Sequence, residues 1–112
     1  MNITPCQCFS PGFKIPWAEK SDIGVTDRDW ELSKLRCGKC STPWLRAFLE
    51  YEAFSCSGRY YRAPTSDSAL ETITPDAALR IIKDATFRIA GGSRFDGVEH
   101  VIHGPGELLE TP

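Results

Sequence analysis

Cysteines provide the clearest chemistry in this chain. Four of the five form two close pairs, Cys6-x-Cys8 and Cys37-x-x-Cys40. A CxxC turn directs two sulfurs at one point, and a second pair from a distant segment can complete a tetrahedron around zinc. The spacing therefore predicts a zinc site with these four residues as ligands. A four-thiolate site is closed to water and substrate, which is typical of structural rather than catalytic zinc.

The Cys37–Cys40 spacing has a second interpretation as a redox-active dithiol. Such a dithiol needs a thiolate whose pKa is lowered at a helix N-terminus, after a strand. The segment before Cys37 is rich in proline and glycine turn formers, which disfavours that arrangement. A disulfide is a third interpretation, although an odd number of cysteines cannot all pair within one chain.

The fifth cysteine and the two histidines are not predicted to join a site. Cys56 falls in the turn-forming run 55–58 and is interpreted as a small turn residue. His100 and His103 would share one face of a helix, but residues 98–102 look extended, which places the two side chains on opposite sides. Neither histidine lies in an HExxH or Ser/His/Asp setting, so no hydrolytic mechanism is assigned and an enzyme is disfavoured.

Basic residues bracket the Cys37–Cys40 turn, and no acidic residue lies between Glu31 and Glu50. The favoured interpretation is that these cations offset the negative charge of a zinc–thiolate cluster, and the alternative is a small anion-binding patch. Acidic residues outnumber basic ones, 15 to 13, which is unlike a strongly basic nucleic-acid-binding protein. Nucleic-acid binding therefore remains the alternative function, through Lys34, Arg36, Lys39 and Arg46.

An aromatic and basic run, Arg59-Tyr60-Tyr61-Arg62, is the predicted binding surface. Adjacent residues of a strand face opposite ways, so one of the two tyrosines should be exposed and flanked by arginines. Tyrosine and arginine are among the residue types that most often carry interface energy. This run therefore favours recognition of another protein.

The elements that must position these residues begin with an irregular segment over residues 1–29, anchored by the first cysteine pair. Residues 30–35 form a short predicted strand that leads into the Cys37–Cys40 turn. The next stretch, 43–54, is ambiguous because its apolar residues fit both helical spacing and strand alternation. We favour a long hairpin, with residues 59–62 as the returning strand.

A helix is predicted to start at Thr74, which can cap it, with Pro75 at its first position and Asp76 in its first turn. Its apolar stripe should pack on the sheet and consists of Ala78, Leu79, Ile82 and Ala85. A further strand is expected over 87–90, followed by a glycine-rich hairpin loop. Residues 104–112 are expected to form a flexible C-terminal tail.

The length of 112 residues predicts a single domain, 1–112, and 41% hydrophobic with 25% charged residues is ordinary globular composition. No apolar run approaches the roughly 18 residues that span a bilayer, and the N-terminus lacks the features of a signal peptide. The expected location is the cytoplasm, with no membrane association. In that reducing compartment paired cysteines favour metal ligation over disulfides.

Several short motifs in roughly the first 63 residues occur together. They are an N-terminal CxC, Trp30-Glu31-Leu32, Cys37-Gly38-Lys39-Cys40, Trp44-Leu45 and the run from Ser57 to Arg62. In this combination the chain resembles small bacterial zinc-ribbon-like proteins of uncharacterised function. The resemblance implies that the four paired cysteines bind structural zinc and that the metal performs no catalysis.

Taken together, these patterns predict an α+β fold with a mainly antiparallel sheet, one packed helix and a structural four-cysteine zinc site. The expected function is non-enzymatic protein–protein recognition by a small zinc-binding domain. The small size and net acidity suit an immunity-type inhibitor of a toxin, by analogy of class alone. A nucleic-acid-binding zinc-ribbon module and a CxxC thiol oxidoreductase are the two alternatives.

Overall fold

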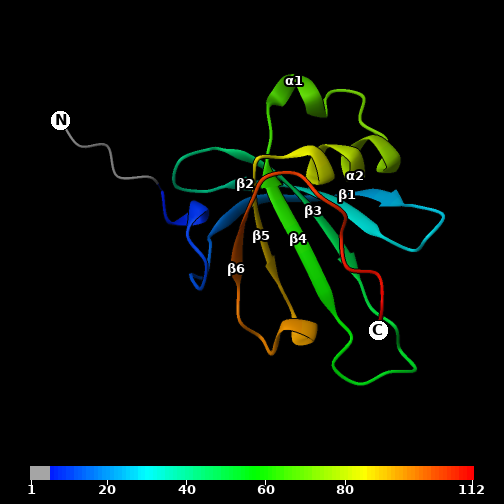
Figure 1. Ribbon diagram of the computed structural model, residues 1–112. Helices are drawn as coiled ribbons and strands as arrows, with labels where there is room; N and C mark the ends of the chain where they lie inside the picture. The colour runs from blue at the N-terminus through cyan, green and yellow to red at the C-terminus, as the bar shows by residue number, and fades with distance from the viewer. Residues whose placement is uncertain (1–5) are drawn as a thin grey trace.

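A computed structural model describes residues 6–112 and contains one antiparallel sheet with helices on one of its faces (Figure 1). Six strands pair in the order in which they follow one another along the chain. They are β1 (Trp17–Val25), β2 (Glu31–Cys37), β3 (Pro43–Leu49), β4 (Arg59–Pro64), β5 (Phe87–Gly91) and β6 (His100–His103). The described residues also form helices α1 (Asp67–Leu70) and α2 (Pro75–Asp84) and the 3₁₀ turns η1 (Gln7–Phe9) and η2 (Ser93–Phe95). The predicted α+β class is confirmed.

Alternation along the central strands gives the sheet two different faces. In β3, Leu45, Ala47 and Leu49 are buried on the side where α2 and the C-terminal segment pack, here called the covered face. Trp44 and Arg46 project to the opposite side, here called the open face. Residues 6–16 lie over one end of the open face, where Phe9 packs against Trp44.

Helix α2 begins where the sequence predicts. The Thr74 hydroxyl accepts a hydrogen bond from the Ala77 N–H at 3.2 Å, and Pro75 occupies the first turn. Ala78 and Ile82 are fully buried against the covered face, as the apolar stripe requires. No helix within residues 6–112 is long and apolar enough to cross a membrane.

The ambiguous stretch 43–54 begins as a strand. β3 pairs with β4 in antiparallel register from Trp44 opposite Pro64 to Leu49 opposite Arg59. The favoured hairpin is therefore confirmed and the helical alternative is wrong. The strand ends at Leu49, and residues 50–58 form the connecting loop, where the Ser57 hydroxyl bonds the Tyr51 N–H and carbonyl.

The N-terminal region contains a strand that the sequence analysis did not predict. Within the expected irregular segment 1–29, the nine-residue strand β1 pairs antiparallel with β2. Its register shifts between Trp17 and Glu19 and again between Asp22 and Gly24. Because β1 is an edge strand with mostly exposed side chains, it carries little of the hydrophobic alternation that identifies a strand.

The expected flexible tail, 104–112, instead packs on the covered face, where it runs back across the sheet beside α2 (Figure 1). Leu108 is only 4% exposed and belongs to the main hydrophobic core. Buried arginines fix the backbone: Arg59 donates to the carbonyls of Leu109 and Thr111, and Arg88 donates to those of Gly104 and Gly106. The prediction failed because this segment lacks regular periodicity, although its carbonyls are satisfied by side chains from distant strands.

Candidate functional site

The four paired cysteines converge at one end of the open face. Cys6 immediately precedes the η1 turn and Cys8 lies within it, whereas Cys37 ends β2 and Cys40 lies in the turn before β3. All four sulfur atoms lie within 4.8 Å of one another. The sequence-predicted ligand set is thus brought together from segments about 30 residues apart.

The separations between sulfurs fit a tetrahedral metal. The Sγ atoms of Cys6 and Cys37 are 3.7 Å apart, and those of Cys8 and Cys40 are 3.6 Å apart. Zinc–sulfur bonds of about 2.3 Å in a tetrahedron require sulfurs about 3.8 Å apart. Four thiolates in this geometry suit zinc or iron. The cluster is therefore compatible with a metal site.

Close backbone approach holds the N-terminal segment against the Cys37–Cys40 turn. The Gly38 N–H donates to the Pro16 carbonyl at 2.7 Å, and a Cβ at position 38 would lie only 2.5 Å from that oxygen. Glycine is thus required in the CGKC turn for steric reasons. This contact joins residues far apart in sequence immediately beside the sulfurs.

Donors around the sulfurs influence their protonation. The Lys39 N–H points at the Cys37 Sγ at 3.4 Å, and the Thr42 hydroxyl lies 3.1 Å from the Cys40 Sγ. The Thr42 hydrogen bond is the main cause that lowers the pKa of the Cys40 thiol to about 6. Burial raises the pKa of the Cys8 thiol, and the Trp44 indole opposes that shift. Such donors orient thiolates and stabilise their charge at metal sites.

A second, smaller hydrophobic cluster surrounds the cysteines. Cys8, Leu35, Cys37 and Trp44 are buried together, apart from the core on the covered face. The rings of Phe9 and Trp44 lie 5.0 Å apart, and Trp17 packs edge-on to Trp44 at 6.3 Å. Trp30 and Trp44 are fully buried, so both serve packing.

Arg62 reaches this cluster from β4 and is 3% exposed. One of its terminal nitrogens donates to the Cys8 carbonyl at 2.6 Å, and its guanidinium lies 4.5 Å from the Trp44 ring centre. The other terminal nitrogen is buried without a partner. A buried guanidinium beside the cysteines would offset the negative charge of a thiolate cluster.

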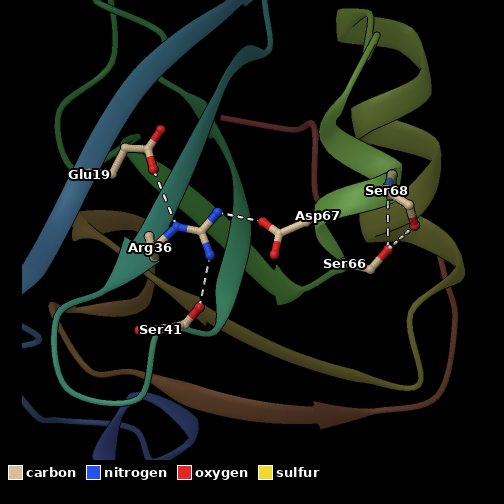
Figure 2. Close-up of polar contacts among 7 residues, drawn as sticks. Glu19, Arg36, Ser41, Ser66, Asp67 and Ser68 are labelled. Atoms are coloured by element: carbon tan, nitrogen blue, oxygen red, sulfur yellow. Dashed lines mark hydrogen bonds and ion pairs between the residues drawn. The ribbon is translucent and has the colours of Figure 1, made fainter.

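The four cations that bracket the Cys37–Cys40 turn do not form one patch. Arg36 donates to Glu19 at 3.3 Å, to Asp67 at 2.5 Å and to the Ser41 carbonyl at 3.0 Å (Figure 2). The Asp67 hydrogen bond is the main cause that raises the pKa of Arg36. The pairing register places Lys34 on the covered face and Arg46 on the open face, while Lys39 is exposed in the turn itself. Arg36 therefore ties α1 to the sheet.

The predicted binding surface, Arg59 to Arg62, is largely wrong. Arg59, Tyr61 and Arg62 are each less than 5% exposed, and only Tyr60 is partly exposed. The alternation of the two tyrosines is as expected, because Tyr61 packs on the covered face near Trp30. Arg59 and Arg62 were predicted to lie at the surface because the residue types alone do not show that their side chains donate to buried carbonyls.

The remaining candidate residues lie outside the cysteine cluster. Cys56 is exposed in the loop between β3 and β4, as its turn-forming neighbours predict. His100 and His103 belong to β6 and pair with Ala90 and Phe87, so their side chains face opposite sides of the sheet as predicted.

Sequence reasoning missed a cavity of about 500 Å³ on the open face. Its lining includes Lys14, Trp17, Lys20, Arg46, Tyr60 and Arg62. These residues come from the N-terminal segment and from β1, β3 and β4, so no local spacing links them. The alternation of Arg46, Tyr60 and Arg62 with buried apolar residues was the available signal, because it places all three on one face.

The fold and the cysteine cluster together define a small α+β domain with an antiparallel sheet and a candidate four-thiol metal centre. Comparison with protein-family models, with curated proteins and with solved structures finds no match to this chain. The turn between Cys37 and Cys40 leads directly into β3, whereas a thioredoxin-like dithiol begins a helix. The chemistry of this chain must therefore be inferred from its own residues.

Proposed function

We propose that this chain is a non-enzymatic recognition domain whose four-cysteine centre holds a structural zinc ion. The convergence of four sulfurs within 4.8 Å carries this proposal. Zinc with four thiolates has no open position for water or substrate, so it would act through folding rather than through catalysis. Here it would fasten residues 6–16 onto the open face of the sheet.

The resemblance to zinc-ribbon-like proteins supports zinc over iron. In zinc ribbons the metal is structural, and a CxxC pair in a tight turn between antiparallel strands supplies two of the ligands. Cys37 and Cys40 occupy such a turn between β2 and β3. The second pair, Cys6 and Cys8, would complete the centre.

The proposed partner is another protein, and its proposed contact surface lies beside the open face. Phe13 and Val98 are 49% and 55% exposed and line one shallow hollow together with Tyr60. We call these three residues the apolar rim. Exposed apolar and aromatic side chains that lie together are typical of protein contact sites. An inhibitor of the immunity type is one form that such recognition can take.

Affinity capture with the zinc-loaded domain, read out by mass spectrometry, tests this function. Val98→Ser should lose the captured partner, because it removes an apolar contact from the rim. Phe54→Ser is the matched control, since Phe54 is equally exposed, at 56%, but lies in the loop between β3 and β4. Equal capture by the two variants and the wild type would contradict the proposed surface.

The same preparations should be analysed for metal and for melting temperature. About one zinc ion per chain in all three proteins would show that the variants alter the surface and leave the centre intact. Iron in place of zinc, or no metal after purification under reducing conditions, would contradict the zinc assignment.

A further inference from the structure

The cavity on the open face has the size of a small-molecule site. Its volume of about 500 Å³ falls within the range of about 300–1,000 Å³ that is typical of ligand pockets. One wall is formed by Lys14 of the N-terminal segment and Trp17 of β1, and the floor is the sheet, with Arg46, Tyr60 and Arg62. The cavity therefore brings together polar and aromatic groups from four parts of the chain.

Positive charge dominates this cavity. Lys14, Lys20, Arg46 and Arg62 line it, whereas Glu99 is its one acidic residue. Within residues 6–112, none of the four cations lies within 4 Å of a carboxylate. Glu99 accepts hydrogen bonds from the Gly12 N–H at 2.7 Å and from the Tyr60 hydroxyl, so its charge is already engaged.

Two of the cations are held away from water without full compensation. Arg62 is 3% exposed and has one terminal nitrogen with no partner. Arg46 is half-buried, and its guanidinium lies 4.9 Å from the Tyr60 ring centre. Desolvation lowers the pKa of both groups, but arginine stays charged at neutral pH. Buried charge without a partner is unfavourable, so an anion in the cavity would be stabilised.

The cysteine cluster accounts for only part of this charge. Arg62 donates to the Cys8 carbonyl, and the negative charge that acts on it most is that of Glu99, ahead of Cys8 and Cys37. Arg46 instead lies over the rings of Phe48 and Tyr60, and Lys20 is exposed on β1. Arg46 and Lys20 therefore remain available to a ligand even when the thiolates hold a metal.

Aromatic side chains supply flat walls beside the cations. Trp17 and Tyr60 line the cavity, and Phe13 stands at its edge. Tyr60 lies flat on the sheet because Gly91 has no side chain; a Cβ there would approach the Tyr60 hydroxyl to 2.5 Å. Aromatic faces next to arginine or lysine bind planar rings attached to phosphate.

We propose that this cavity binds a small phosphorylated ligand with a planar ring, of the size of a mononucleotide. Phosphate carries close to two negative charges and several acceptor oxygens, which suits a site with four cations better than a single carboxylate does. A free small ligand is favoured over a nucleic-acid strand because the chain as a whole has a net charge of −2. The ligand goes beyond the protein recognition proposed above.

Isothermal titration calorimetry with metal-analysed protein tests the proposal. The probes are the four 5′-ribonucleoside monophosphates and inorganic phosphate. At least one nucleotide should bind with a Kd below about 1 mM and more tightly than inorganic phosphate, since the ring adds stacking. Heats indistinguishable from dilution for all four nucleotides would overturn the proposal.

Matched variants locate the binding. Lys20→Ala and Arg46→Ala should each weaken nucleotide binding about tenfold, the usual effect of losing one charge-assisted hydrogen bond. Lys20 is exposed, so its variant keeps the fold. Arg80→Ala removes the same charge from the exposed side of α2 and should leave the Kd unchanged. Equal losses in Lys20→Ala and Arg80→Ala would overturn the assignment to this cavity.

Two further probes distinguish the source of the anion. A single-stranded 12-nucleotide oligonucleotide that binds over a hundredfold more tightly than any nucleotide, with steep salt dependence, would replace the small ligand by a nucleic-acid surface. A hexaglutamate peptide that binds when nucleotides do not would replace phosphate by carboxylate. Metal content in the same samples separates the two proposals: metal-free protein that binds nucleotides contradicts the zinc centre and retains the ligand site.

Discussion

The two buried arginines of β4, one on each face of the sheet, differ in how completely their donors are bonded. Arg59 and Arg62 both belong to β4 but project to opposite faces. On the covered face, the side-chain nitrogens of Arg59 donate to carbonyls of Ser57, Leu109 and Thr111. On the open face, Arg62 bonds one carbonyl, of Cys8, and leaves a buried nitrogen unpaired.

This difference separates a structural role from a binding role. A buried guanidinium whose donors are satisfied holds the chain together, as Arg59 holds the C-terminal segment. A buried guanidinium with a free donor beside a cavity retains interaction energy for a ligand. The two faces also differ in their packing. Apolar side chains of α2 and Leu108 pack on the covered face. On the open face, the N-terminal segment packs through the cluster that contains the cysteines.

Loss of the proposed metal should lower the stability most, because it releases residues 6–16 from the open face. Cys37→Ser is expected to abolish zinc binding and to lower the free energy of unfolding by more than about 5 kcal/mol, since metal-binding energy is also folding energy. Zinc analysis and thermal unfolding measure this. Cys56→Ser is the control and should match the wild type, because Cys56 is exposed and outside the cluster. If Cys37→Ser loses zinc but melts normally, the covered face alone holds the fold.

Charge on the covered face should have the next largest effect. Ile82→Asp places a carboxylate at a fully buried position of α2 and should cost about 3 to 5 kcal/mol in chemical denaturation. Ala77→Asp introduces the same side chain at an exposed position in the first turn of α2, where it should be neutral or mildly stabilising. A similar loss of stability in both variants would mean that α2 does not pack on the sheet through the side that carries Ile82.

The C-terminal segment gives an intermediate test of the covered face. Leu108→Ala should lower the free energy of unfolding by about 2 to 3 kcal/mol, because it leaves a cavity in the core. Thr111→Ala changes an exposed side chain and keeps the carbonyl that accepts from Arg59, so its stability should be unchanged. If neither variant differs from the wild type, the segment is as loose as the sequence suggests.

The smallest effect on stability is expected for Arg36, whose ion pairs lie at the surface. Arg36→Ala removes the contacts to Glu19 and Asp67 at the surface (Figure 2). Exposed ion pairs contribute little and are screened by salt. The melting temperature should change by close to the error of measurement, and less still at high salt. A large loss would show that α1 depends on this contact.

The sequence predicted those features that rest on local rules. The cap at Thr74, the apolar stripe around Ile82 and the hairpin of β3 and β4 follow from short-range spacing and are confirmed. The convergence of the cysteine pairs was also predictable, because two close pairs from distant segments are the usual spacing of a four-cysteine metal site.

The features that the sequence did not predict depend on distant partners. Arg59 was interpreted as a surface residue because nothing near it in sequence indicates that its donors reach Leu109 and Thr111. The cavity was missed for the same reason, since Lys14 and Arg46 become neighbours only through the sheet. Edge strand β1 lacked a hydrophobic signal because none of its side chains is fully buried.

The irregular register of β1 has a consequence for self-association. Among residues 6–112, the chain-order sheet has no further strand beside the outer edges of β1 and β6, which could therefore pair with strands of other molecules. β6 has only four residues, so it offers a short template. β1 is longer, but its two register shifts and the charged Glu19, Lys20 and Asp22 interrupt a flat hydrogen-bonding edge. The same strand that escaped prediction thereby protects the protein from edge-to-edge aggregation.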